Sequence, residues 1–267
     1  MTQGKKKRIR IGGIAIDPLS RSELCERLDA LVVSGRPHAV VFCEANLLVQ
    51  ANRSPAVCEA IKQASLVLPD GVAVTLGGYL IGEPFPDRLS GPTVMLLYCA
   101  HGVERGFRHF FYGGVPGVPE RLAENLSAAL PGLVVVGTLS PPFRPLTESE
   151  DRDVIARIEK SGCDVLWVGL GAPKQELWMA EHLDRIRVPL MLGVGAAFDF
   201  HSGTQRWAPA SVRRLGIEWA WRMLLTGGPR IFRRGLDVLP AYARILAREA
   251  LTRRRTRSER DNEEREC

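Results

Sequence analysis

Short apolar runs alternate along the chain with longer segments whose apolar residues recur at helical spacing. The short runs are typical of buried strands, and the 3.6-residue period is typical of helices that pack one face on a core. We expect strands at residues 9–16, 38–42, 66–68, 109–112, 133–137, 164–168 and 189–194. We expect helices at residues 20–33, 46–65, 74–81, 91–106, 119–129, 148–161 and 174–184. This alternation predicts an α/β fold with a Rossmann-like, mostly parallel sheet and helices on both faces.

The strand signal stops near Gly203, which predicts a domain boundary there. Residues 1–203 are expected to form the α/β domain. Residues 204–252 are rich in Arg and Trp at helical spacing and predict a helical appendage. Its apolar stripe is Val238, Leu239, Tyr242, Ile245 and Leu246. Residues 253–267 are charged without an apolar anchor, so they are predicted to be disordered.

Composition places the chain among globular proteins, with 267 residues, 45% hydrophobic and 25% charged. No apolar run has the length that a membrane-spanning helix needs, and the basic start is a poor signal peptide. The six cysteines lack paired spacing and read as free thiols in a reducing compartment. The histidines show no metal-ligand spacing, so no metal is expected.

The positive charge lies in the last quarter of the chain. Residues 201–267 hold 15 arginines against 8 acidic residues, whereas residues 1–200 hold 21 basic and 22 acidic residues. No lysine follows Lys174. Guanidinium groups bind phosphate oxygens bidentately, which indicates phosphate or anionic headgroups. A GC-rich genome would also favour arginine over lysine.

Arginines and aromatic residues stand together in the appendage, including Arg222, Arg230 and Arg233 near Trp219 and Trp221. Such a surface suits a bilayer interface. The alternative is a helix that packs on the main domain and leaves its arginines solvated. Nucleic acid is the least favoured partner, because the main domain has neither a basic groove-reading helix nor a stacking platform.

The segment GLGAPKQE, from Gly169 to Glu176, follows a strand and opens a helix. Gly171, Lys174, Gln175 and Glu176 would then lie at the carboxyl edge of the sheet, where α/β proteins hold ligands. An ordinary loop with solvated polar residues is the alternative, because glycine-rich loops of this kind are common.

Three further positions follow strands. Asp70 in LVLPDG reads as a turn residue when taken alone, or as a carboxylate that accepts a proton from a hydroxyl nucleophile. Gly113 and Gly114 would let the backbone approach an anionic ligand, although no dinucleotide fingerprint or P-loop is present. Asp199 would bind sugar hydroxyls or cap a helix.

Taken together, these motifs resemble the WecG/TagA/CpsF family of bacterial glycosyltransferases over about residues 8–234. The matching segments are LVLPDG (Leu66–Gly71), Pro84-x-Pro86-x-Arg88 with Gly91, FFYGG-x-PG (Phe110–Gly117), VGT (Val136–Thr138), VGLGAPKQE (Val168–Glu176), GVG-x-x-FD (Gly193–Asp199), AP (Ala208–Pro209), LG-x-EW-x-x-R (Leu215–Arg222), and Pro229-Arg230 with Arg233.

The resemblance implies inverting transfer of a sugar from a UDP-sugar to a polyprenyl-diphosphate-linked saccharide, without metal or other cofactor. Asp70 becomes the expected general base, which reverses the preference for a turn. Gln175 is expected at the sugar and diphosphate, and Arg222, Arg230 and Arg233 at the diphosphate. Residues expected around the donor nucleotide are Gly71, Arg88, Gly113, Gly114, Gly171, Lys174, Glu176 and Asp199.

Several positions depart from the family pattern. Phe42-Cys43-Glu44 stands where Thr-x-Asn is common, which makes Glu44 a candidate second carboxylate. Arg206 is a candidate for the Arg of the usual R-A-P. The donor sugar is therefore open between N-acetylmannosamine and glucose types, and a nucleotide-binding regulatory module with altered chemistry is the alternative function.

The same resemblance implies a cytoplasmic protein that binds an anionic membrane surface at the inner face of the bacterial plasma membrane. A homo-oligomer is compatible with the sequence, and nucleic acid is not an expected partner.

Overall fold

The computed structural model describes residues 6–209, 211, 212, 221 and 237–254. The strands are β1 (Ile9–Ile11), β2 (Ile14–Ile16), β3 (His38–Cys43), β4 (Leu66–Pro69), β5 (Arg108–Gly113), β6 (Val134–Leu139), β7 (Val165–Gly169) and β8 (Leu190–Gly193). The helices are α1 (Arg21–Val32), α2 (Ala45–Arg53), α3 (Pro55–Gln63), α4 (Gly71–Leu80), α5 (Gly91–Arg105), α6 (Val118–Ala129), α7 (Glu148–Ser161), α8 (Lys174–His182) and α9 (Ala197–His201). Residues 237–254 are also helical, and we call them the C-terminal helix.

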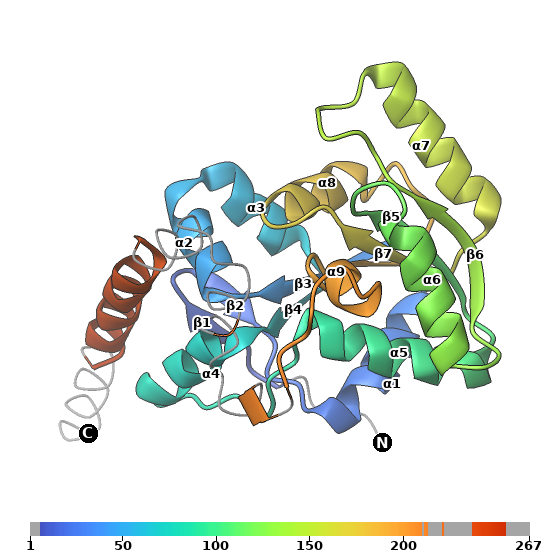
Figure 1. Cartoon of the computed structure of the whole chain (residues 1–267). Helices are drawn as coiled ribbons and strands as arrows, with labels where there is room; N and C mark the ends of the chain where they lie inside the picture. Colours follow the sequence, from blue (N-terminus) through green and yellow to red (C-terminus); the bar gives the residue numbers. More distant parts are fainter. Residues whose placement is uncertain (1–5, 210, 213–220, 222–236, 255–267) are drawn as a thin grey trace.

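Six strands form one parallel sheet in the order β4-β3-β8-β7-β5-β6 (Figure 1). The remaining strands, β1 and β2, pair antiparallel in a hairpin of their own. Every strand of the large sheet ends at the same edge, because all six are parallel. The α/β class and the parallel sheet expected from the sequence are therefore confirmed.

Helices cover both faces of the sheet (Figure 1). One core holds side chains of α2, α3, α4, α7, α8 and the hairpin, and the other holds side chains of α1, α5, α6 and α9. Alternate strand residues point into opposite cores: Val41 and Val67 join the first, whereas Val40 and Leu66 join the second. Burial on both faces explains the nearly continuous apolar strands.

Two expected elements are each divided in the structure. The strand expected at residues 9–16 is the β1–β2 hairpin, which turns at Gly12 and Gly13, both with positive φ. The helix expected at residues 46–65 is α2 followed by α3, because Pro55 removes a helical N–H and excludes a continuous helix. Ser54 caps α3 by accepting a hydrogen bond from the Val57 N–H at 3.5 Å.

The C-terminal helix packs against α4 and the hairpin. Tyr242 is buried and donates a hydrogen bond from Oη to the Ala73 carbonyl at 3.1 Å, and Ile245 is buried in the same core. Arg253 pairs with Glu83 at 3.0 Å. The inner half of the expected apolar stripe therefore packs on the main domain. The helix extends to residue 254, two residues past the expected boundary, and residues 255–267 lie outside the described residues.

Candidate active site

Most residues singled out in the sequence follow strands of the large sheet. Glu44 follows β3, Asp70 follows β4, Gly114 follows β5, Gly171 follows β7 and Gly195 follows β8. Adjacent strands lie about 4.8 Å apart, so the three steps from β4 to β7 place Asp70 roughly 14 Å from the GLGAPKQE loop. One extended ligand along this edge would reach both.

Asp70 lies between two helices. Its backbone N–H donates to the Cys43 carbonyl at 3.0 Å, which continues the β3–β4 pairing by one residue. Its carboxylate Oδ2 accepts a hydrogen bond from the Gly91 N–H, at the first turn of α5, at 3.3 Å. Gly71 follows with φ 77° and has open space where a side chain would stand. The half-buried carboxylate is thus oriented at the sheet edge, and the open space lies at the next residue, Gly71.

Three carboxylates surround the end of β3. Cys43 is fully buried, and its thiol pKa is raised well above the ordinary value by burial first and then by the charges of Glu176, Glu44 and Asp70. Glu44 is exposed at the N-cap of α2 and accepts a hydrogen bond from Asn46 Nδ2 at 3.4 Å. The structure therefore brings Glu44 into the neighbourhood of Asp70.

Gln175 is buried, and its amide is bonded within the protein. Nε2 donates to the Gly193 carbonyl at 2.8 Å and to Glu176 Oε1 at 2.9 Å, and Oε1 accepts from the Gly171 N–H at 3.2 Å. Gly193 leaves the space for this contact, since a Cβ there would stand 3.2 Å from Nε2. Through these hydrogen bonds, the Gln175 side chain holds the GLGAPKQE loop against the end of β8.

Glu176 is 1% exposed, and burial raises its pKa to about 7, with a smaller contribution from the charge of Glu44. Its Oε1 accepts the Gln175 bond, whereas Oε2 has no hydrogen-bond partner among the described residues. A buried carboxyl without a second partner is costly when ionised. Glu176 therefore changes charge close to neutral pH.

Gly113, Gly114 and Gly169 let the ends of the paired strands β5 and β7 approach closely. A Cβ at Gly113 would lie 2.5 Å from the Gly169 carbonyl carbon, and one at Gly169 would lie 2.6 Å from the Phe198 ring. The Gly114 N–H donates to the Gly169 carbonyl at 3.0 Å. These contacts account for the glycines by packing within the protein, and their expected role in donor binding stays a prediction.

The β5, β6 and β7 loops converge on a second part of the edge. Lys174 is exposed, and its Nζ lies 4.7 Å from the ring centroid of Phe143, which is 95% exposed in the β6–α7 loop. Ser140 Oγ donates to the Val115 carbonyl at 3.2 Å and ties the β6–α7 loop to the β5–α6 loop. Lys174 thus faces the β6 side of the sheet.

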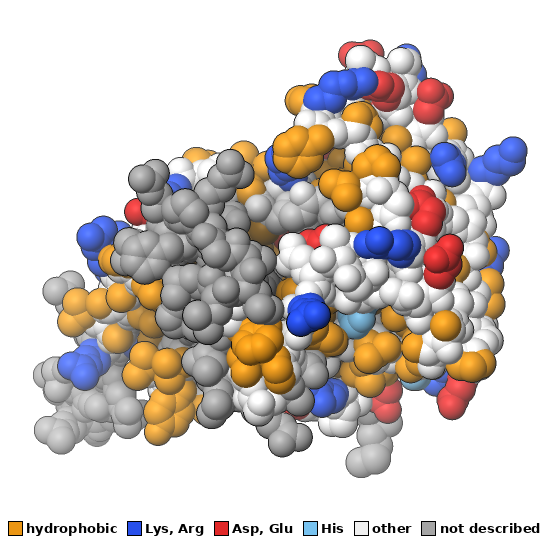
Figure 2. All heavy atoms as spheres, viewed as in Figure 1, with side chains coloured by type: hydrophobic (Ala, Val, Ile, Leu, Met, Phe, Trp, Pro, Cys, Tyr) orange, Lys and Arg blue, Asp and Glu red, His pale blue; other side chains and the backbone are white. Residues whose placement is uncertain are grey.

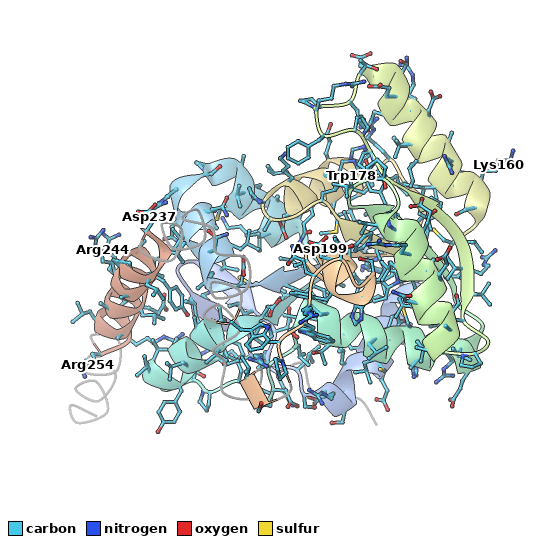
Figure 3. All side chains as sticks on the ribbon, in the orientation of Figure 1. Lys160, Trp178, Asp199, Asp237, Arg244 and Arg254 are labelled. Atoms are coloured by element: carbon cyan, nitrogen blue, oxygen red, sulfur yellow. The ribbon has the colours of Figure 1, made fainter. Side chains whose placement is uncertain are left out.

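Asp199 lies in α9, near the centre of the view in Figure 3. Its backbone carbonyl accepts from the Gln205 N–H at 2.9 Å, and its Oδ2 accepts from Gln205 Nε2 at 3.5 Å. Arg206 is exposed in the segment after α9, and Arg88 is half-buried in the loop that precedes α5. Arg222, Arg230 and Arg233 lie outside the described residues.

The described part of the chain contains neither a metal-binding cluster nor a membrane-spanning helix. There, no group of three His, Cys, Asp or Glu side chains is arranged to hold a metal ion. Across the same residues, no helix combines the length and the apolar character that crossing a bilayer requires. Cys25, Cys43, Cys58, Cys99 and Cys163 are free thiols, as expected from their spacing.

Sequence reasoning missed Asn46 and the exposure of Phe143. Asn46 stands two residues after Glu44, so an Asn does follow β3, two positions beyond the place where the family pattern has one. The sequence signal for this residue was the presence of an Asn two residues after Glu44, in Glu44-Ala45-Asn46. Nothing in the pattern Ser140-Pro141-Pro142-Phe143 indicates that the ring projects beside Lys174.

Comparison with known proteins adds to this geometry. Residues 9–256 match the model of the glycosyl transferase WecG/TagA/CpsF family. A Bacillus spizizenii protein named N-acetylglucosaminyldiphosphoundecaprenol N-acetyl-beta-D-mannosaminyltransferase is 26% identical over 210 residues, 79% of each chain. A Staphylococcus aureus protein of the same name is 27% identical over 222 residues, 82% of this chain and 85% of the relative. The chain belongs to the WecG/TagA/CpsF family and is a glycosyltransferase.

Proposed function

We propose that this glycosyltransferase moves a sugar from a UDP-sugar to a polyprenyl-diphosphate-linked saccharide during synthesis of a bacterial surface polysaccharide or exopolysaccharide. The names of the relatives favour N-acetylmannosamine over glucose as the sugar and N-acetylglucosaminyl-diphosphoundecaprenol as the acceptor. The same names specify a beta-D product. A β product from an α-linked UDP-sugar supports inversion at the anomeric carbon.

The position of Asp70 carries the proposal. Its carboxylate lies at the ligand edge of the sheet, is oriented by the Gly91 N–H and has open space at Gly71. A carboxylate in such a place can take the proton of a hydroxyl nucleophile. In the proposed step, an acceptor hydroxyl oxygen bonds to the anomeric carbon and its proton passes to Asp70. The bond between that carbon and the diphosphate oxygen breaks, and its electron pair leaves with UDP.

The remaining residues bind and orient. Gln175 holds the loop that carries Gly171 and Lys174, so the donor meets a fixed surface. We assign Arg222, Arg230 and Arg233 to the diphosphate, where guanidinium groups would balance the charge that develops on UDP. In this proposal the arginines replace a metal ion. The protein then works peripherally at the inner face of the plasma membrane, where the lipid-linked acceptor is held.

Asp70→Asn tests the base directly. Asparagine keeps an oxygen that accepts the Gly91 hydrogen bond but does not take a proton from the acceptor. We expect transfer to fall about 10²–10⁴-fold while UDP affinity changes little. The measurement is mass spectrometry of the product from UDP-N-acetylmannosamine and a lipid-diphosphate acceptor. Asp87→Asn is the matched control, since Asp87 also accepts a backbone N–H, from Arg21 at 2.8 Å, in a neighbouring loop.

Transfer by Asp70→Asn at nearly the wild-type rate would show that another group is the base. Glu44→Gln would then be measured next, because Glu44 is the neighbouring exposed carboxylate.

The identity of the donor sugar is tested by measuring transfer from a panel of UDP-sugars that includes UDP-glucose. Full activity after exhaustive chelation is the expected result for metal independence, and recovery only with an added divalent ion would contradict it.

A further inference from the structure

Glu176 is a buried carboxyl group at the ligand edge of the sheet that the proposed chemistry leaves unused. It lies in the first turn of α8 and is 1% exposed, and its Oε2 has no hydrogen-bond partner among the described residues. Buried polar atoms rarely lack a partner, and the exceptions are often found where a group takes part in function. A neutral carboxyl group tolerates such a position far better than a carboxylate does.

Gln175 connects Glu176 to two loops of the candidate active site. Its Nε2 donates to Glu176 Oε1 and to the Gly193 carbonyl, and its Oε1 accepts from the Gly171 N–H. A Cβ at Gly195 would lie only 3.3 Å from Gln175 Oε1. The β7–α8 and β8–α9 loops therefore both pack on an amide that Glu176 helps to orient.

The groups closest to Glu176 give its negative charge no compensation. Cys43, at the end of β3, and Glu44, at the N-cap of α2, interact with Glu176 and carry no positive charge. Asp70 adds a further negative charge near Cys43, and β8 contributes only apolar residues and glycine. Burial, and then the charge of Glu44, accordingly raise the pKa of Glu176 to about 7.

The basic side chains on α8 and α3 have other partners. Lys174 lies over the Phe143 ring, and His182, at the end of α8, is bonded to a carboxylate of α7. Helix α3 packs beside α8 and carries Glu59 and Lys62, whose charged groups lie 3.9 Å apart. In the part of the chain that the structure describes, no basic side chain bonds to the buried carboxyl group.

The face of the molecule that carries α8 and α9 favours anions. Figure 2 shows basic side chains near these two helices, whereas acidic side chains gather over α6 and α7. The first turn of α8 adds the positive end of a helix dipole. A diphosphate held at the β7–α8 loop is therefore attracted by this face, but it is repelled by Glu176 whenever Glu176 is ionised.

We propose that Glu176 is a positioning residue that takes up a proton when the diphosphate of the donor binds at the β7–α8 loop. Protonated at Oε2, Glu176 keeps Oε1 as the acceptor for Gln175 and removes a negative charge from beneath the loop. The proton comes from the solvent, and no other bond forms or breaks. This inference deepens the proposed function and rests on it, because it takes UDP as the anion that binds the loop.

The affinity for the donor then depends on pH. Well below pH 7 Glu176 already carries its proton, whereas above pH 7 each binding event requires proton uptake. We expect the Kd of wild type for UDP to rise roughly fivefold to tenfold between pH 6 and pH 8.5. Glu176→Gln is neutral at every pH and keeps an acceptor for Gln175, so it should remove that rise. Comparing the two proteins cancels the titration of UDP itself, whose terminal phosphate has a pKa of about 6.

Isothermal titration calorimetry of the full-length chain with UDP counts the protons. Titrations at pH 7 in PIPES and in imidazole, two buffers that differ in ionisation enthalpy, give the number of protons taken up per UDP bound. We expect wild type to take up about 0.4 proton more than Glu176→Gln, as for a carboxyl group whose pKa rises by about one unit from 7. A purely structural role of Glu176 would not change this number.

Glu181→Gln is the matched control. It makes the same substitution at an exposed position on α8, so its proton uptake should equal that of wild type. A measurement on wild type alone applies even if Glu176→Gln folds poorly. In protein labelled with ¹³C at its glutamate carboxyl groups, UDP binding at pH 7.5 should add the infrared band of a protonated carboxyl group. Absence of that band would overturn the proposal.

The outcomes separate this inference from the proposed function. UDP binding with equal proton uptake in wild type and Glu176→Gln would overturn the role of Glu176 and leave the proposed donor intact. No UDP binding by wild type would contradict the donor itself, and the proton coupling with it.

Discussion

Asp70 occupies the N-cap of α4, yet its carboxylate accepts its hydrogen bond from the first turn of α5. Two helices therefore set the position of one side chain. The sequence showed only a Pro-Asp-Gly turn at this point, because Gly91 is 21 residues away along the chain. A turn and an oriented carboxylate are both present at Asp70, and only the tertiary fold shows the orientation.

At the same scale, Glu176 makes folding stability depend on pH. Its pKa is about 7 in the folded protein and 4.5 for an ordinary glutamate. Below pH 4.5 the carboxyl is protonated in both the folded and the unfolded chain, so its contribution is fully present there. The contribution is lost as pH rises through 7, because the unfolded chain ionises more easily.

Glu176→Gln removes this titration and keeps an oxygen to accept the Gln175 bond. Relative to wild type, we expect the variant to gain roughly 2–3 kcal/mol of unfolding free energy between pH 5 and pH 8. Urea unfolding at pH 5, 6, 7 and 8 measures it. Glu104→Gln, which makes the same substitution at an exposed position on α5, is the matched control. Parallel pH profiles for wild type and Glu176→Gln would place the titration elsewhere.

At the scale of elements, the ends of β5 and β7 fit together only because glycines stand at their contact. Gly113→Ala puts a methyl group 2.5 Å from the Gly169 backbone at φ 133°, where side chains are strained. We expect a loss of roughly 2–4 kcal/mol in unfolding free energy. Urea unfolding at constant pH gives the value, with UDP affinity measured in parallel.

Gly171→Ala is the control for this contact. Gly171 also has a positive φ, 77°, but nothing lies within 4 Å of a Cβ there. Its cost should be limited to backbone strain, about 1–2 kcal/mol. Equal costs for the two variants would mean that backbone conformation, and not the contact between β5 and β7, explains Gly113.

Local sequence patterns predicted most of the helices and strands. They failed where a Pro or a Gly pair interrupts a continuous apolar pattern. The period of apolar residues spans 46–65 without interruption, so it predicted one helix, although Pro55 divides it. Gly12 and Gly13 likewise turn one apolar run into a hairpin. In the site, strand ends predicted the positions of Asp70, Glu44 and the GLGAPKQE loop. The internal bonding of Gln175 depends on Gly193 in another strand, and local sequence does not encode it.

At the scale of the whole molecule, Tyr242 joins the C-terminal helix to the helix that follows Asp70. Tyr242→Ala removes a buried ring and the bond to the Ala73 carbonyl. We expect a loss of about 2–4 kcal/mol and faster proteolysis within residues 237–254. Leu239→Ala, an exposed position on the same helix, should change stability by less than about 0.5 kcal/mol. Unchanged proteolysis in the Tyr242 variant would mean that other contacts hold the helix.

The sequence left two environments open for the apolar stripe of the appendage, a bilayer interface or the main domain, and the structure packs part of the stripe on the main domain. Tyr242 and Ile245 face the core, and Leu239 faces outward. Helical periodicity alone does not show which neighbour a face will meet.

The strand order also determines when the protein can fold. β8 is the last strand of the sheet in sequence, yet it lies between β3 and β7 near the middle. Within the described sheet, the pair β4-β3 and the trio β7-β5-β6 are joined by backbone hydrogen bonds only through β8. A ribosome must therefore release about residue 193 before the two parts can close into one sheet. Until then the nascent chain exposes two unpaired strand edges, so synthesis is a stage at which edge-to-edge aggregation is favoured.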